Sequence, residues 1–379
     1  MNNINVNINK LLHLKTTYVM IMYKMVNGRK RIFYLDFIRA LAIILVLSAH
    51  ITRLFYNNAP HSANYMHLVA PMINVAIMGV PLFLMISGAL LLNRKYELGD
   101  FLKRRYRRVL IPFLFWSVVT IILRIFLDNQ APSPSNILTM FFDDYWYVWM
   151  ILGVYLFIPI INAFIENYGI KGVEYFLAIW TFVIILDTAG LYPFHNFELG
   201  NFAGYLGYLV LGYYLSNKEF RISDSNMAIL SLVVLLIITI FSMEHTVSIS
   251  YMKHRLSYYG YQSIEVVIQS AAIYLFIRYF SQCSAKTPGS IKNKIHLFFK
   301  DSFMFKIIFT ISTFSYGIYL AHYISLYSFK WIDKYYFPVF SHNPLKWFPI
   351  ILLAFLVITI VILWILDKIP GLKNITGAN

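Results

Sequence analysis

Three ionisable residues, Asp36, Arg39 and His50, lie within the first apolar stretch of membrane-spanning length in this sequence. Charged groups inside such a stretch cost roughly 3 kcal/mol each on insertion scales, so they mark candidate functional sites. Arg39 and His50 are eleven residues apart, about three helical turns, so they point the same way and lie roughly 16 Å apart along the axis. Asp36 precedes Arg39 by three residues, which permits an ion pair on the same face.

A neutral imidazole exchanges protons near pH 7, which makes His50 a candidate general base. A purely structural interpretation is the alternative. In that case Arg39 extends to the membrane interface, and His50 forms a hydrogen bond with a neighbouring helix. The spacing predicts, in either case, one helix face that presents Asp36, Arg39 and His50 to the interior of a bundle.

The composition requires that this helix belong to an integral membrane protein. Of the 379 residues, 59% are hydrophobic and 13% are charged, whereas a soluble domain carries about 25% charged residues. The net charge of +15 is explained by basic cytoplasmic loops. We expect no nucleic-acid partner, because the sequence has no compact polar domain that could bind one.

The fold class predicted is all-α, a polytopic membrane protein of about ten transmembrane helices. A bilayer core of about 30 Å needs roughly 20 apolar residues in a helix. That length selects ten spans, near residues 33–55, 68–92, 109–127, 145–165, 173–192, 201–216, 226–243, 262–280, 306–328 and 347–367.

The distribution of basic residues predicts the orientation of these spans. With the N-terminus inside, the cytoplasmic segments carry 22 of the 32 Lys and Arg residues and the outer loops carry 6. This bias places both termini in the cytoplasm. The domains predicted are a basic cytoplasmic tail, residues 1–31, and a transmembrane domain, residues 32–373.

The tail and the single cysteine allow two further expectations. Residues 11–26 are apolar but interrupted by charge, which is compatible with an amphipathic surface helix or with translation that starts at Met22 or Met25. No small-residue cleavage site follows the first apolar run, so we expect no cleaved signal peptide. Cys283 is the only cysteine, so we expect no disulfide framework and no metal site.

Five segments, in order along the chain, resemble motifs of acyltransferase family 3. The first runs from Leu35 to His50 and is similar to that family's opening helix, where an Arg, ten residues and a His follow one another. Another resembles its Phe-x-x-Ser-Gly motif, although one extra residue separates Phe83 from Ser87. The remaining segments are a basic loop and two aromatic helix segments, at residues 101–112, 146–159 and 315–322. The resemblance covers about residues 32–373.

This resemblance implies a membrane-bound acyltransferase, typically an O-acetyltransferase, in the cell membrane. The donor is cytoplasmic acyl-CoA, usually acetyl-CoA, as a co-substrate rather than a bound cofactor. The acceptor is a hydroxyl of a glycan, a lipid-linked saccharide or another envelope molecule. Membrane lipids are the remaining partners expected. Neither the acceptor nor the oligomeric state follows from the sequence.

Donor binding is expected at the cytoplasmic half of the bundle. Arginine forks suit phosphate oxygens, and a pair of small residues leaves room for a slender pantetheine arm. The donor-binding residues predicted are Arg39, Asp36, Ser87, Gly88, Arg104, Arg105 and Arg108. The alternatives are that the arginines set topology and attract anionic lipids, and that the small pair serves close helix packing.

His50 is the catalytic residue predicted, either as general base for the acceptor hydroxyl or through a covalent acyl-His. His322 lies at a comparable depth, and the interpretation that the sequence favours for it is a core histidine with satisfied hydrogen bonds. Aromatic faces beside carboxylates commonly hold sugars. The possible acceptor-side residues are therefore His322, Trp146, Trp149, Asp143 and Asp144, with an interfacial aromatic belt as the alternative for the tryptophans.

Two other functions remain open at this point. An exporter or transporter of a polysaccharide or its precursor would also bury polar residues in a helix bundle, and paired mid-span helix breaks would favour it. A structural membrane protein without catalysis would require Asp36, Arg39 and His50 to be accidental.

Overall fold

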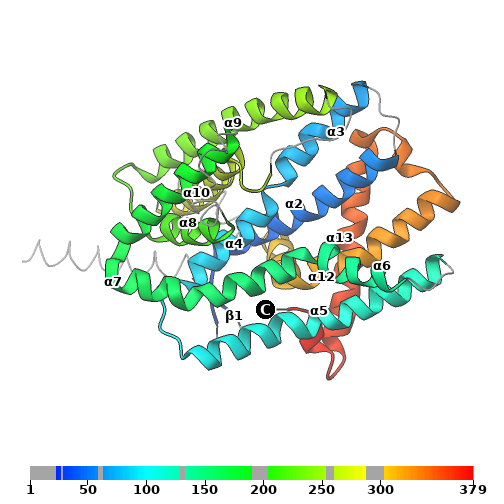
Figure 1. The fold of residues 1–379 in the computed structure, drawn as a ribbon, viewed down its shortest axis with the longest axis horizontal. Coiled ribbons are helices and arrows are strands. Elements are labelled where there is room, and N and C mark those ends of the chain that lie inside the picture. Colours follow the sequence, from blue (N-terminus) through cyan, green and yellow to red (C-terminus); the bar gives the residue numbers. More distant parts are fainter. Residues whose placement is uncertain are drawn as a thin grey trace, which may run out of the picture.

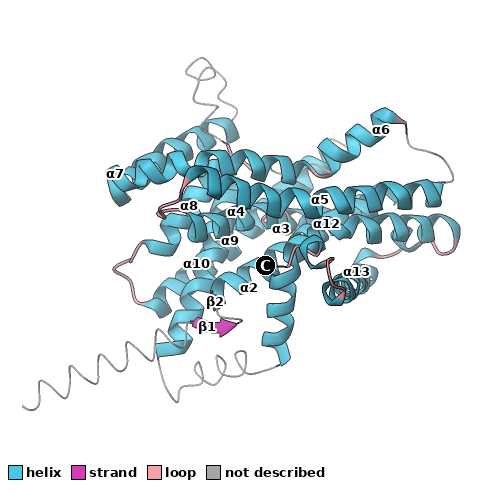
Figure 2. Ribbon diagram, turned by 90° about the horizontal axis from the view of Figure 1, so that it is seen from below, coloured by secondary structure: helices cyan, strands magenta, loops and turns pink. Residues whose placement is uncertain are grey.

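The computed structural model describes residues 23–26, 29–58, 63–128, 133–189, 204–252, 260–286 and 303–378. These residues form a helical bundle (Figure 1), preceded by a short antiparallel hairpin of β1 (Tyr23–Val26) and β2 (Arg29–Ile32) at one end of it (Figure 2). The all-α, polytopic class predicted is confirmed. Apart from the part within the hairpin, the tail segment 11–26 lies outside the described residues.

Eight helices in the described part of the chain are long and apolar enough to cross a membrane. Large apolar side chains are exposed on their outward faces, among them Phe126, Ile237 and Leu353, as lipid-facing positions require. The described α-helices, including α6 and α8, which are too short to be counted as spans, and α3 and α4, which together make one span, are α2 (Phe33–Asn58), α3 (Ala63–Ala76), α4 (Gly79–Leu91), α5 (Leu98–Asp128), α6 (Pro134–Thr139), α7 (Trp146–Thr188), α8 (Leu206–Asn217), α9 (Asp224–Met252), α10 (Ile264–Lys286), α12 (Phe303–Tyr335) and α13 (Pro344–Lys368).

The difference between eight candidate spans and ten predicted spans has two sources. The 43-residue α7 bends at Gly169, whose φ of 59° and ψ of −150° interrupt the helix, so it contains two of the predicted spans. Glycine adopts this positive φ without steric cost. The predicted span at 201–216 corresponds to α8, which has only 12 residues.

The short helix α8 packs along its side against α4, and its last turn is bound by a side chain of α10. A Cβ on Gly88 of α4 would lie 1.7 Å from the carbonyl oxygen of Leu209, and a Cβ on Gly212 would lie 2.0 Å from that of Met85. The backbones of α4 and α8 therefore touch, which is how small residues pack membrane helices. The buried Arg278 of α10 donates to the carbonyl oxygens of Leu215 and Lys218 and so caps the last turn of α8.

The predicted span at 68–92 is not one continuous helix. It divides into α3 and α4 at Ile77 and Met78. Pro81 explains the position of the break, because a proline has no N–H and its ring clashes with the carbonyl group four residues earlier, here that of Ile77. The broken pair packs against α2, where a Cβ on Gly79 would lie 2.8 Å from the carbonyl oxygen of Ala42.

The central helix α2 packs against α12, α3, α4, α10 and α13. The segment after α13 then enters the bundle beside α5 and α12 (Figure 1). Trp116 of α5 donates its indole N–H to the carbonyl oxygen of Ile375 at 2.9 Å, and the carbonyl of Thr376 lies directly against Gly317 of α12. This C-terminal segment, which includes η5 (Lys373–Ile375), thus contacts both α5 and α12, which also carry predicted site residues.

Candidate active site

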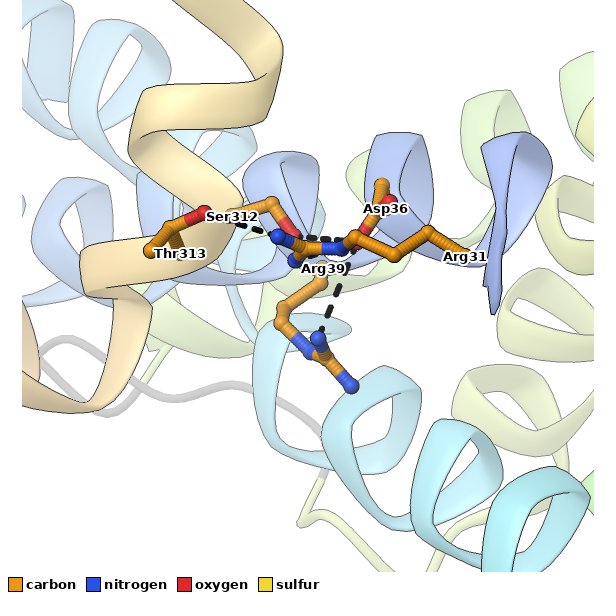
Figure 3. A network of polar contacts seen from close by, with 5 residues as sticks. All are labelled: Arg31, Asp36, Arg39, Ser312 and Thr313. Carbon is orange, nitrogen blue, oxygen red and sulfur yellow. Dashed lines mark hydrogen bonds and ion pairs between the residues drawn. The ribbon is translucent and has the colours of Figure 1, made fainter. Parts of the chain in front are cut away.

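Asp36 is the centre of a polar network at the start of α2 (Figure 3). Its carboxylate accepts hydrogen bonds from Arg31 at 2.9 Å and from the hydroxyl of Ser312 at 2.8 Å. The predicted partner Arg39 lies farther away, at 3.7 Å. Arg31 also donates to Thr313 at 3.0 Å, so the network joins β2, α2 and α12.

The predicted Asp36–Arg39 pair is therefore present, but the closer partner is Arg31, which the sequence pattern does not single out. Arg31 precedes Asp36 by five residues and reaches it only because β2 leads directly into α2. The guanidinium groups of Arg31 and Arg39 share the one buried carboxylate of Asp36, so this cluster carries a net positive charge. The other charged neighbours of Arg39 include Arg108 of α5.

A pocket of about 440 Å³ brings together the three arginines predicted to bind the donor. It is lined by Arg104, Arg105, Arg108, Tyr96 and Phe101. The two aromatic rings lie against each other, with centroids 4.5 Å apart. Asp100 lies 3.6 Å from Arg104 and offsets part of the positive charge. The pocket thus combines positive charge with an aromatic wall, which suits an anionic ligand.

Ser87 and Gly88 have other contacts. The Ser87 hydroxyl donates to the carbonyl oxygen of Phe83 on its own helix, at 2.9 Å. Gly88 lies against the backbone of Leu209. These contacts agree with the helix-packing interpretation. A donor-binding role for the two residues stays a prediction without a supporting contact among the described residues.

The structure brings His50 of α2 and His322 of α12 together. Their ring centroids are 4.6 Å apart and their planes are inclined by 50°. The sequence places the two histidines at similar depth but does not predict their contact. His50 is partly buried, and His322 is fully buried at 0% exposure.

The hydrogen bonding of His322 favours one tautomer. Its Nδ1 lies in hydrogen-bonding contact with the carbonyl oxygen of Tyr319, which can only accept, so Nδ1 carries the proton. In the neutral ring Nε2 then has a lone pair. Nε2 is buried and has no hydrogen-bond partner within the described parts of the chain. Of the two ring nitrogens of His322, the described residues thus satisfy Nδ1 but not Nε2.

Aromatic side chains surround the histidine pair. The Tyr323 ring lies 4.2 Å from the ring of His322 and 5.7 Å from that of His50. The Tyr323 hydroxyl donates to the backbone carbonyl of Asp144, and Tyr327 donates to the Asp144 carboxylate at 3.1 Å. Burial raises the pKa of this carboxyl group. Among the predicted acceptor-side residues, Asp144 is thus linked to the histidine pair through Tyr323.

The remaining acceptor-side residues predicted are dispersed. Trp146 packs against Tyr205 and Tyr261, with ring centroids 5.8 and 5.4 Å apart. Trp149 stacks on Phe142 at 5.1 Å, and Asp143 is exposed. The two tryptophans pack against different neighbours, so their contacts do not define one common sugar-binding surface.

No group of three His, Cys, Asp or Glu residues that could hold a metal ion occurs in the part of the chain that the structure describes.

The model of a protein family described as an acyltransferase domain matches residues 32–366 of the chain. No curated protein and no solved structure matches it.

Proposed function

The chain belongs to acyltransferase family 3, and on that basis we propose that it transfers an acetyl group from cytoplasmic acetyl-CoA to a hydroxyl of an envelope saccharide. Membership and the membrane-spanning helices establish a multi-pass membrane acyltransferase. The acetyl group, the coenzyme A donor, the saccharide acceptor and the cell membrane as location are the proposed part.

The observation that carries the proposal is the arrangement along α2. This helix holds Arg39 near Arg108 at one level and His50 against His322 at another. The two levels are roughly 16 Å apart by the helical rise. A donor with phosphates at one end and a thioester at the other matches a site with arginines at one end and imidazoles at the other.

In the proposed reaction, Arg104, Arg105 and Arg108 bind the phosphates through charge-assisted hydrogen bonds. His50 takes the proton of the acceptor hydroxyl as its oxygen attacks the thioester carbonyl carbon. The new C–O bond forms, the C–S bond breaks, and the proton passes to the departing thiolate. An acyl-His50 intermediate would give the same products in two steps.

Mass spectrometry of envelope glycans tests this proposal directly. Cells that produce the wild-type protein should carry glycans with the added mass of an acetyl group, and cells with His50→Ala should not. His67→Ala is the matched control, because His67 is an exposed histidine of α3 and should leave acetylation intact. Equal amounts of inserted protein must be present in all strains.

Two results would overturn the proposal. One is unchanged glycan mass in the presence and absence of the protein. The other is retained acetylation in the His50→Ala strain. Loss of the glycan from the cell surface, without any change in its acylation, would support the exporter instead.

The donor assignment has a separate test in Arg39. Arg39→Ala should abolish transfer, and Arg39→Lys should restore only part of it, because lysine keeps the charge but lacks the planar fork. Acetyl-CoA binding to the purified protein should weaken in the same order. Unchanged binding by the alanine variant would exclude Arg39 from the donor site.

A further inference from the structure

The hydroxyl group of Tyr319 is buried without a hydrogen-bond partner among the described residues. The residue is 6% exposed. A buried hydroxyl without a partner lowers the stability of the folded state, so its presence in a packed helix interface requires an explanation. Phenylalanine would fill the same space without this cost.

Neighbouring tyrosines show what an ordinary buried hydroxyl does in this bundle. Tyr316 donates to the carbonyl oxygen of Val109 at 2.9 Å, and Tyr145 donates to that of Leu320 at 3.1 Å. Tyr323 donates to the backbone of Asp144. Each of these groups ties two helices together or fixes a turn. The Tyr319 hydroxyl, by contrast, donates to no group in the described part of the chain.

The position of Tyr319 relates this unused donor to the proposed site. Its ring centroid is 5.7 Å from that of His322 and 5.3 Å from that of Tyr147. Along α12 it lies between Ser312, which bonds Asp36, and His322, which contacts His50. On α12, Tyr319 thus lies between the residue that contacts the Asp36 network and the residue that contacts His50, and under the proposed function the donor extends between these two points.

The Tyr319 hydroxyl and His322 Nε2, both without a hydrogen-bond partner among the described residues, differ in what they can offer a ligand. The Tyr319 hydroxyl is a donor, whereas His322 Nε2 is an acceptor in the tautomer described above. A thioester carbonyl needs a donor as negative charge develops on its oxygen, and hydroxyl groups fixed in a dry site meet that need without reorganisation.

We infer that Tyr319 is a further catalytic residue, whose hydroxyl stabilises the oxyanion of the acyl-transfer transition state. The inference rests on the proposed function. As the acceptor oxygen attacks, the carbonyl π electrons move onto the carbonyl oxygen, which accepts a hydrogen bond from Tyr319. The C=O bond re-forms as the C–S bond breaks, and the electron pair leaves with the sulfur, which takes the proton held by His50. Tyr319 keeps its own proton throughout.

The test compares Tyr319→Phe with Tyr316→Phe in purified protein. Transfer of labelled acetyl from acetyl-CoA is measured onto envelope saccharide from cells that lack the protein. Tyr319→Phe should lower kcat by roughly 100-fold or more, which is the effect of removing one oxyanion donor. The KM for acetyl-CoA should stay within about threefold, because an interaction made only in the transition state does not contribute to ground-state binding.

Thermal stability separates catalysis from structure. Tyr319→Phe removes an unpaired polar group and should keep or raise Tm, whereas Tyr316→Phe removes a made hydrogen bond and should lower Tm while retaining kcat. Activity of Tyr319→Phe within about threefold of wild type would overturn the inference, as would a loss of activity that follows a lowered Tm.

The failure of the inference is distinguishable from that of the proposed function. If the wild-type protein transfers acetyl, His50→Ala does not, and Tyr319→Phe remains active, only the role of Tyr319 is wrong. If the wild-type protein transfers no acetyl to the saccharide, the proposed function fails and the oxyanion role fails with it.

Discussion

His50 and His322 lie ring against ring, with centroids 4.6 Å apart, although they come from the first and the penultimate membrane-spanning helices of the described structure. The contact makes α12 a part of the candidate active site. Substitution of His322 can therefore test whether its Nε2, which has no partner among the described residues, takes part in the reaction.

We expect His322→Phe to lower acetyl transfer by roughly 100-fold or more, which is the range typical of a proton-transfer residue. Phenylalanine retains an aromatic ring at the contact with His50 but has no ring nitrogen. The measurement is acetyl transfer per inserted protein, and unchanged Tm shows that packing is retained. Full activity in this variant would show that His322 has a packing role only.

Gly88→Ala should destabilise the protein by about 1–3 kcal/mol or more, because overpacking a close helix contact has that cost. The new Cβ would overlap the backbone of Leu209, which cannot rotate away. Gly153→Ala is the matched control, since a Cβ there meets nothing within 4 Å. A lower Tm for the first variant alone supports the packing role. Unchanged Tm with a raised KM for acetyl-CoA would instead support donor binding.

Asp144→Asn should raise Tm at neutral pH relative to wild type. Burial raises the pKa of the Asp144 carboxyl above its unfolded value, so ionising this group in the folded state costs stability. That cost is absent below the unfolded pKa and appears as pH rises through the folded pKa. Asparagine removes the charge and keeps an oxygen that can accept from Tyr327.

The pH dependence is the decisive part of this prediction. The difference in Tm between Asp144→Asn and wild type should shrink as pH falls from neutral through the raised pKa of the carboxyl group. A difference that grows on acidification would contradict the sign of the shift.

The orientation of the bundle has its own test. Cysteines at positions 95 and 133, in a Cys283→Ser background, should respond oppositely to an impermeant thiol reagent in intact cells. The side chains of Lys95 and Ser133 are both exposed, so access depends on the side of the membrane. Position 95 should be protected and position 133 labelled. The reverse pattern would place the arginine pocket outside, away from coenzyme A, and would favour the exporter.

Much of the helical framework could be predicted from hydropathy, because membrane thickness dictates the length of apolar segments. Helix periodicity was likewise sufficient for the Asp36–Arg39 pair, since that contact is local. The common pocket of Arg104, Arg105 and Arg108 follows from their closeness along one helix. Local rules therefore account for these parts of the site.

The contacts between distant helices could not be predicted in this way. The histidine pair depends on how α2 and α12 pack, and the role of Arg31 depends on a hairpin that turns its side chain back to Asp36. The unpaired hydroxyl of Tyr319 becomes visible only when all its neighbours are known. Neither hydropathy nor residue spacing contains that information.

The C-terminal segment between α5 and α12 has a consequence for donor selection. Its contacts with Trp116 and Gly317 join the helix that carries the arginine pocket to the helix that carries His322, and these two helices also contact each other directly. Because one packed segment contacts both helices, we expect the arginine pocket and the histidine pair to keep a constant separation. Under the proposed function, a thioester on a shorter or longer arm would miss the histidines even when its phosphates were bound, and selection would be by length as well as by charge.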